Sequence, residues 1–330
     1  MSQIEIPLCP ECTGVESVDR RDFMRVVGGG TAAVLAGATL TPIVAAQHRI
    51  PTPAATPRPA EALCRELWTT LTAEQRRQYV YAWDHPNRLR TFNAAMNGRI
   101  SQVYTRPQQE LLERIMRAIS AGEDGFTKLS RNGGWDTGGG FGGCGANFFG
   151  DASTNQWSWV FSCHHLTVRC DGNSEPDYAF GGPMYYGHSP DGHSVRNVFS
   201  SQTRAAQSVY DSLNEQQRRR AIMTTSGGGS NTFRQNGYPG IGAADLSADQ
   251  RRLVESVMRE LLAPYRREDA DEVMDLVRRN GGLERLHLGF YGAGGGDNRW
   301  SYWRIEGPGF VWNYRVLPHV HCWVNVALRA

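Results

Sequence analysis

Two histidines near the end of the chain have the spacing of a metal-binding pair. They are His319 and His321, in the stretch LPHVHCWVNV at residues 317–326. Side chains alternate between the two faces of a β-strand, so both imidazoles lie on one face, with Val320 and Cys322 on the other. Two histidines at positions i and i+2 of a strand can hold one metal ion. The alternative is a pair of polar residues on an exposed strand that bind nothing.

A third imidazole is available from FSCHHLTVRC, residues 161–170. We expect a strand here, so only one of His164 and His165 faces a given site. His188 and His193, after a Pro/Gly turn, are either further ligands or ordinary loop residues. Imidazole-rich sites suit Zn, Cu, Fe or Ni better than Mg or Ca, which prefer oxygen ligands. The predicted cofactor is therefore a transition metal ion, Cu or Zn.

Other sequence motifs that would indicate a reaction are missing. The stretch TGGGFGGCGANFFG, residues 137–150, contains GxGxxG, but no hydrophobic strand precedes it and no helix follows, as a dinucleotide site requires. The glycine-rich stretches at 224–231 and 291–298 lack the Gly-Lys-Ser/Thr of a phosphate loop. A net charge of +2 argues against nucleic acid as a partner.

The N-terminus has the pattern of a twin-arginine export signal. DRRDFMR at residues 19–25 precedes a weakly apolar Gly/Ala stretch, less apolar than the roughly 20 residues of a membrane span. Small residues before Gln47 predict cleavage there, with residues 1–46 as the signal and 47–60 as a Pro-rich linker. An uncleaved anchor is the alternative. We expect a periplasmic or secreted protein, without a membrane span in the mature chain, whose partner is the twin-arginine export machinery.

The cysteines leave the redox chemistry open. Cys9 and Cys12 form a CxxC motif but precede the predicted cleavage site. Five cysteines remain, and an odd number in an oxidising compartment leaves at least one thiol outside any disulfide. Cys163 and Cys170 are able to pair, but spacing alone does not define connectivity. The five are Cys64, Cys144, Cys163, Cys170 and Cys322.

Residues 61–330 read as one duplicated α+β domain. LTAEQRRQ from Leu71 matches LNEQQRRR from Leu213, and the offset of 142 residues recurs across two helices. Each copy reads as helices, a Gly-rich loop and a β-hairpin, and we expect a central antiparallel sheet to join the copies. Repeat one covers about 61–170, a connecting segment 171–202, and repeat two about 203–330. Predicted helix caps followed by glutamine recur in both copies: Thr72 with Gln75, Thr105 with Gln108, Asn214 with Gln217, and Ser247 with Gln250.

The order of these motifs resembles a known family. LTAEQR, HHLTV, GGPMYYGHSP, WRIEGPGFVWNY and HVH look like an exported bacterial family catalogued as a domain of unknown function and numbered thirty-five hundred. The resemblance covers about residue 63 to the C-terminus and brings no reaction with it. Members usually continue HxH with Arg-Asp, whereas CWVNVALRA follows here. The resemblance implies that His165, Gly307, Pro308, His319 and His321 occupy signature positions.

Three functions are compatible with this sequence. The first is an exported metalloenzyme, a hydrolase or oxidoreductase, with a metal on His165, His319 and His321, and with Glu306 or Asp177 as a candidate proton-transfer group. The second is a metal carrier or sensor with the same ligands. The third is a glycan- or peptide-binding module without metal, lined by tryptophans. His164 and His188 are further candidate metal ligands, and the tryptophans are Trp157, Trp159, Trp300 and Trp303.

Overall fold

The computed structural model describes residues 59–224, 231–292 and 300–329. All of them fall within one unit, residues 51–330. The predicted export signal, with Cys9 and Cys12, lies outside the described residues, as does the predicted linker up to its last two residues, Pro59 and Ala60, which begin the first described helix. Among the described helices, none has both the length and the apolar character that crossing a membrane requires.

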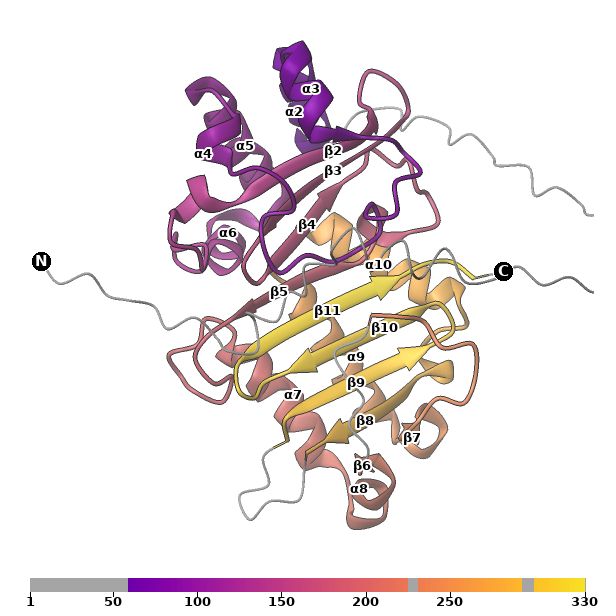
Figure 1. The fold of residues 1–330 in the computed structure, drawn as a ribbon. Coiled ribbons are helices and arrows are strands. Elements are labelled where there is room, and N and C mark those ends of the chain that lie inside the picture. The colour runs from indigo at the N-terminus through magenta and orange to yellow at the C-terminus, as the bar shows by residue number, and fades with distance from the viewer. Residues whose placement is uncertain (1–58, 225–230, 293–299, 330) are drawn as a thin grey trace, which may run out of the picture. The chain divides into compact units, whose positions relative to one another are not determined.

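The described chain alternates helices and strands, and this confirms the predicted α+β class. An 11-stranded sheet forms its centre (Figure 1). The helices are α2 (Pro59–Thr70), α3 (Ala73–Tyr79), α4 (Ile100–Val103), α5 (Arg106–Ile119), α6 (Gly122–Ser130), α7 (Ser200–Ser212), α8 (Glu215–Ala221), α9 (Ala248–Leu262) and α10 (Arg267–Arg279), with short 3₁₀ turns η1 (Gly140–Gly143), η2 (Ala179–Gly181), η3 (Ala243–Asp245) and η4 (Leu283–Arg285). The strands are β1 (Val80–Tyr81), β2 (Gly145–Asp151), β3 (Gln156–Cys163), β4 (Leu166–Cys170), β5 (Met184–His188), β6 (Ile222–Met223), β7 (Ile241–Gly242), β8 (His287–Tyr291), β9 (Tyr302–Gly307), β10 (Phe310–Arg315) and β11 (Val320–Val326).

The two edges of the sheet have the same arrangement of strands: a two-residue strand pairs in parallel with its neighbour, and antiparallel strands follow. The strand order runs β1-β2-β3-β4-β5-β11-β10-β9-β8-β6, with β7 paired to β8. The outer pairs β1–β2 and β6–β8 are parallel, and the pairs between them are antiparallel. At the centre, β5 and β11 join the two halves, with Val320 opposite His188 and Val324 opposite Met184. The segment 171–202, which we described as connecting, thus contributes strand β5 to the middle of the sheet.

The glutamines near the helix starts cap the helices and also form hydrogen bonds with one another. In all four predicted boxes the glutamine side chain accepts the backbone amide of the cap residue. The glutamines also bond reciprocally, Gln75 with Gln108 and Gln217 with Gln250, through Nε2–Oε1 contacts of 2.8 to 3.1 Å. Each pair ties one short helix to the next long one. The two pairs are again 142 residues apart in the sequence, and the internal duplication stays our interpretation of these correspondences.

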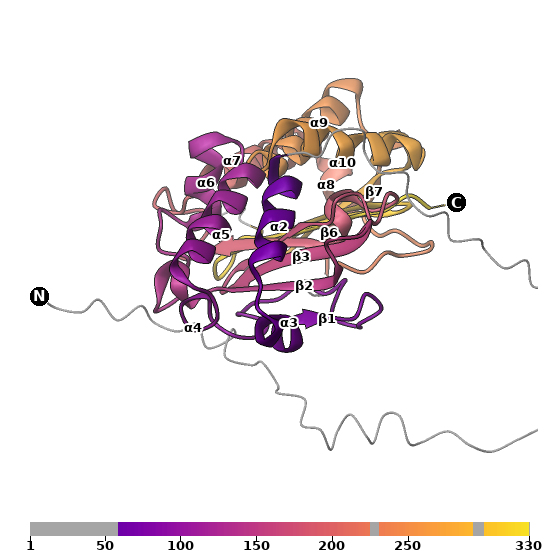
Figure 2. The ribbon, with the colours of Figure 1, turned by 90° about the horizontal axis from the view of Figure 1, so that it is seen from above.

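One face of the sheet packs on the longer helices and forms the apolar core. Figure 2 shows α2, α5, α6, α7, α9 and α10 on this side. Phe148, Trp159 and Trp312 are almost completely buried, and Tyr186 on the same face donates from its hydroxyl to the Leu261 carbonyl of α9. The alternation of apolar side chains along the strands therefore points them at the helices.

The opposite face of the sheet is polar, yet it is buried too. Loops at residues 82–99 and 231–240 cover it, and side chains of the sheet satisfy their backbone groups. Thr167 Oγ1 bonds both the amide and the carbonyl of Phe92, and Asn325 Nδ2 donates to the Asn231 carbonyl at 2.8 Å. The alternative of an exposed histidine strand is therefore wrong, because His321, which shares this face, is only 6% exposed.

The glutamine pairs give a prediction for stability. In Gln108→Ala, the Thr105 amide loses its cap, and the Thr70 carbonyl and Gln75 lose buried hydrogen bonds. We expect the free energy of unfolding to fall by about 2 to 4 kcal/mol. Denaturant unfolding followed by circular dichroism measures this loss. Glu110→Ala, on the exposed side of the same helix, is the control and should change stability little; equal stability of both variants would contradict the prediction.

Candidate metal centre

Three imidazoles from distant parts of the chain meet at one point. His165 Nε2 lies 3.1 Å from His319 Nε2, which lies 2.8 Å from His321 Nε2. Their ligand atoms all lie within 4.8 Å of one another, and the residues are 2%, 4% and 6% exposed. Nitrogens bound to one Zn²⁺ at 2.0–2.1 Å stand about 2.8 to 3.4 Å apart, for bond angles between a right angle and the tetrahedral angle. The distance from His165 to His319 and the distance from His319 to His321 are therefore close to those of a metal site.

His165 reaches this point from a tight turn. We expected His164 and His165 within a strand, but β3 ends at Cys163 and β4 begins at Leu166, so the two histidines form the turn between them. His165 has φ = +60°, a left-handed backbone conformation that costs energy in a residue other than glycine. Its amide donates to Asn93 Oδ1 at 2.9 Å and its carbonyl accepts from the Gly187 amide at 2.8 Å. These two bonds fix the turn that aims the ring.

His319 and His321 come from the start of β11, beside β5. His319 immediately precedes the strand, and His321 pairs with Gly187 of β5. A Cβ atom at Gly187 would stand 3.0 Å from Cδ2 of His321 and 2.3 Å from the Val320 carbonyl oxygen, so glycine is required opposite the imidazole. The Tyr185 ring packs edge-on against His321, with 5.3 Å between ring centroids. The junction of the two sheet halves thus positions these two ligands.

Asp136 orients the third ligand from outside the cluster. Its Oδ2 atom lies 2.8 Å from His165 Nδ1, and its Oδ1 atom lies 2.9 Å from His188 Nδ1. A carboxylate at Nδ1 holds the proton on that nitrogen and leaves the Nε2 lone pair of His165 pointing at the other two histidines. Burial alone raises the pKa of Asp136, but hydrogen bonds from His165 and His188, and the charge of Arg131, outweigh it and hold this pKa well below its usual range.

A buried arginine holds the loop that carries Asp136. Arg131 follows α6, and its Nη2 donates to the Trp135 carbonyl at 3.0 Å and to the His164 carbonyl at 2.8 Å. Its Nε lies 3.7 Å from Asp136 Oδ2. Arg131, Trp135 and Asp136 all have φ near +50°. The loop therefore keeps an unfavourable backbone conformation because Arg131 ties it to the turn that carries His165.

The three imidazoles are neutral at neutral pH, as metal-binding histidines must be. Burial, followed by weaker charge effects, lowers the pKa of His165 to about 4. Burial, then the neighbouring His165 and Arg315, lowers the pKa of His319 to about 3. Burial and Arg315 hold the pKa of His321 well below its usual range. Three neutral imidazoles facing one another are suited to accept a cation.

Arg315 closes the remaining side of the cluster. Its Nη2 lies 3.0 Å from His321 Nε2 and 3.2 Å from His319 Nε2. The guanidinium group donates to the same lone pairs that a metal would use, so metal binding requires this group to move. Arg315 is only half-buried at the end of β10, which gives its side chain room to do so.

The other candidate ligands lie beside the cluster. His164 is next to His165 in the turn, with 3.9 Å between ring centroids, but its nitrogens are not among the converging atoms. His188 contacts Asp136 through Nδ1. His193 Nε2 lies 3.4 Å from the Trp300 carbonyl. The structure thus brings together His165, His319 and His321 and leaves these three outside the triad.

The two carboxylates named as proton-transfer candidates lie away from the histidines. Glu306 aligns with Asn325 across β9, β10 and β11, which places it roughly 15 Å from His321. It is buried beside Arg304 and Arg234 instead. The carbonyl of Asp177 accepts from the Leu328 amide, beyond the far end of β11. No pattern in the sequence marked Asp136 as a site residue, because it follows a glycine-containing turn and belongs to no predicted strand.

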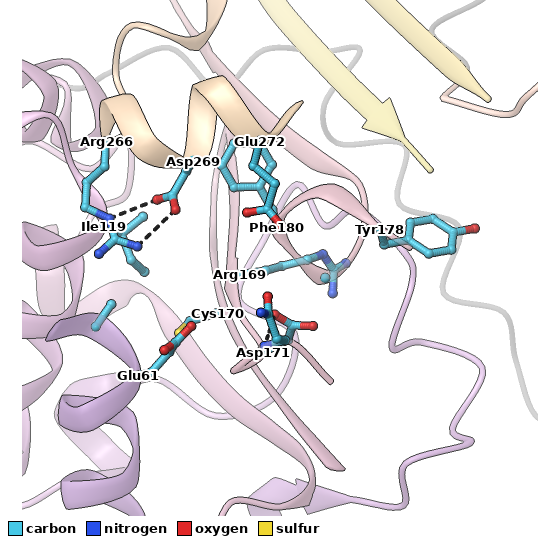
Figure 3. A pocket seen from close by; sticks show the side chains of 13 residues that line it. Glu61, Ile119, Arg169, Cys170, Asp171, Tyr178, Phe180, Arg266, Asp269 and Glu272 are labelled. Carbon is cyan, nitrogen blue, oxygen red and sulfur yellow. Dashed lines mark hydrogen bonds and ion pairs between the residues drawn. The ribbon is translucent and has the colours of Figure 1, made fainter. Parts of the chain in front are cut away.

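The tryptophans suggested as a ligand-binding surface belong to the core. All four are at most 2% exposed on the helix side of the sheet, so they do not form an open binding face. A cavity of about 440 Å³, solvent at its mouth included, lies at the end of β4 away from His165, between α2, η2 and α10 (Figure 3). Glu61, Arg169, Asp171, Arg266, Asp269 and Glu272 line this cavity, and no histidine does.

Comparison with known proteins decides the family. Residues 55–325 match the model of a family described as "Protein of unknown function (DUF3500)". The chain belongs to this family. No curated protein and no solved structure matches it.

An acid and an arginine lie beside the histidines of this chain, although neither follows HVH directly in the sequence. Asp136 contacts His165, and Arg315 contacts both His319 and His321. The orienting groups therefore come from a distant loop and from the neighbouring strand. Gly307 and Pro308, which the resemblance implied to be signature positions, lie at the end of β9 and in the turn before β10.

The lowered pKa values of the histidines predict how stability depends on pH. In metal-free protein, the unfolded chain takes up protons near the ordinary histidine pKa of 6.5, whereas folded His165 does so only near 4. The unfolded state binds more protons between these values, so the free energy of unfolding should fall as pH drops from 6.5 to 4. Chemical denaturation across this range, with chelator present, measures the fall. His165→Asn should flatten the dependence, and an unchanged profile would contradict the explanation.

Proposed function

We propose that this protein binds one transition metal ion, Cu or Zn, through Nε2 of His165, His319 and His321. The observation that carries the proposal is the convergence of the three buried Nε2 atoms, at 2.8 and 3.1 Å from one to the next. Imidazole is a ligand that both metals accept. Asp136 adds the carboxylate–histidine contact that accompanies many such ligands and makes the imidazole more basic.

Three protein ligands leave a metal position open, which favours catalysis over storage. Asp136 is bound to Nδ1 of His165, on the far side of the ring from the convergence point, so it does not serve as a fourth ligand. Arg315 faces the open side and is placed to meet a negatively charged oxygen of a substrate. We therefore propose a metal-dependent hydrolase or oxidoreductase. Asp136 and His188 are better placed to move protons than Glu306 or Asp177.

A metal carrier or sensor is the second candidate. Burial of all three ligands supports it, because a substrate reaches such a metal only if the covering loops or Arg315 move. Binding of azide to the Cu²⁺-loaded protein, followed by absorption spectroscopy, distinguishes the two. An exchangeable position gives a new ligand-to-metal band, whereas a closed site does not. The third candidate, a glycan- or peptide-binding surface, was suggested by four tryptophans. These tryptophans are buried, so nothing now supports this candidate.

We also propose that the protein is exported from the cytoplasm. Arg20, Arg21 and the weakly apolar stretch after them support export by the twin-arginine machinery, which would place the protein in the periplasm or outside the cell. This route carries folded proteins, so a metal could be inserted before export.

Metal content is the first test. Protein prepared without histidine tags and dialysed against Cu²⁺ or Zn²⁺ should retain about one equivalent, measured by elemental mass spectrometry. His319→Ala should retain less than about a tenth of that amount, because two imidazoles remain. His287→Ala is the matched control, since His287 lies on β8 away from the cluster. Retention of less than a tenth of an equivalent by the unaltered protein, with either metal, would rule the proposal out.

Asp136 should tune the affinity for the metal. The Asp136 carboxylate accepts hydrogen bonds from Nδ1 of His165 and Nδ1 of His188. In Asp136→Asn the side-chain amide has only one acceptor oxygen, so the proton of His165 is no longer held on Nδ1. We expect metal affinity to fall about 10- to 100-fold while the three ligands remain. Competition with a chromophoric chelator measures this affinity. Asp84→Asn, at an exposed position, should bind like the unaltered protein; equal affinity of the Asp136 variant would show that the carboxylate does not orient the ligand.

A further inference from the structure

Four of the five described cysteines form two close thiol pairs. In the structure all five are reduced and buried. The thiols of Cys64 and Cys170 lie close enough together that Cys170 adds to the effect of burial in raising the pKa of Cys64, and Cys163 does the same for Cys144. Cys322 lies near the Tyr186 hydroxyl instead, and no other described cysteine is among the groups that affect its pKa. The odd number of cysteines is thus accounted for by two pairs and one single thiol.

The register of the sheet brings Cys144 and Cys163 together. Gly145 of β2 lies opposite Ser162 of β3, so the next antiparallel position sets Cys144 opposite Cys163. Directly opposed residues have Cβ atoms about 4.5 to 5.5 Å apart, close to the 3.5 to 4.5 Å of a disulfide. A small adjustment at the start of β2, next to Cys144, would bring the sulfurs to bonding distance.

The second pair links a helix to the sheet. Cys64 lies on α2 and is fully buried, and Cys170 is the last residue of β4. A bond here would tie the first described helix to a strand more than 100 positions further along. Cross-links between such distant residues restrict the unfolded chain most in the chain-entropy account of disulfides.

We propose that Cys64–Cys170 and Cys144–Cys163 are disulfide bonds in the protein once it has met an oxidant. The oxidant is a disulfide donor, either a thiol oxidoreductase or a small-molecule disulfide. One cysteine thiolate attacks a donor sulfur, which breaks the S–S bond of the donor, releases its first thiolate and forms a mixed disulfide. The second cysteine thiolate then attacks the cysteine sulfur of the mixed disulfide and releases the second donor thiolate. Two electrons pass to the donor, which ends as two thiols, and the cysteine protons are taken up with them.

Each pair has one cysteine on a peripheral segment. Cys64 lies on the first described helix, and Cys144 precedes the first residue of β2, which has only the two-residue strand β1 beyond it. Burial is the main reason that the pKa values of Cys64 and Cys144 are raised, so these thiols react slowly inside the closed fold. The exchange therefore proceeds during folding or through local opening of these segments. This inference does not depend on the proposed metal.

Peptide mapping tests the two bonds directly. The full chain is isolated from an oxidising compartment, unfolded in guanidinium with iodoacetamide and no reductant, digested and examined by mass spectrometry. We expect peptides linked through Cys64–Cys170 and through Cys144–Cys163, with Cys322 alkylated. Alkylation of all five described cysteines, or a Cys163–Cys170 link, would overturn the proposal.

Variants separate the bonds from the folding of the chain. Cys64→Ala/Cys170→Ala and Cys144→Ala/Cys163→Ala should each lose one linked peptide and keep the other. In the unaltered protein, reductant should lower the midpoint of thermal unfolding by several degrees, and each double variant should show a smaller drop. Cys322→Ala is the control and should show the full drop. The metal content of the same samples is measured as well. If both disulfide-linked peptides are found but the protein retains no metal, the metal proposal fails and the disulfide proposal stands.

Discussion

The backbone pairing of β5 with β11 is the contact on which this structure depends. It joins two runs of strands into one sheet, and it does so at the point where the ligands gather. His321 lies opposite Gly187, whose amide also bonds the carbonyl of His165. A single glycine therefore contacts both halves of the site and leaves space for an imidazole. Without this pairing, His165 and the HVH stretch would have no reason to approach each other.

Burial gives these polar groups their chemical character. The face of the sheet opposite the helices holds polar side chains that would ordinarily face water. Loops cover these side chains and form hydrogen bonds with them. In this environment the three imidazoles stay neutral, and Asp136 stays charged because two histidines and Arg131 surround it. The same enclosure that would suit a bound cation would also limit the access of a substrate to it. Arg315 is half-buried and contacts both His319 and His321, so movement of its side chain would open the cluster to a metal and to a substrate.

Local patterns in the sequence predicted much of the fold. Cap residues followed by glutamine located four helix starts, and alternation along HVHCWVNV assigned the faces of β11 correctly. The sequence also pointed to the three histidines that the structure brings together. It did not reveal the role of β5, because GGPMYYGHSP reads as a turn-rich segment and its partner strand is more than 130 residues away. Asp136, Arg131 and Arg315 were missed for a related reason: their contacts are tertiary, and no periodicity marks them.

The distance along the chain between the ligands has a consequence for folding. His165 and His319 are 154 residues apart, so their contact closes a long loop and costs more chain entropy than a local contact does. His319 and His321 are neighbours even in an unfolded chain and can hold a metal weakly before the sheet exists. The third ligand becomes available only when β5 and β11 have paired. A metal in this site would therefore favour the finished sheet over its partly folded precursors by the contribution of one imidazole.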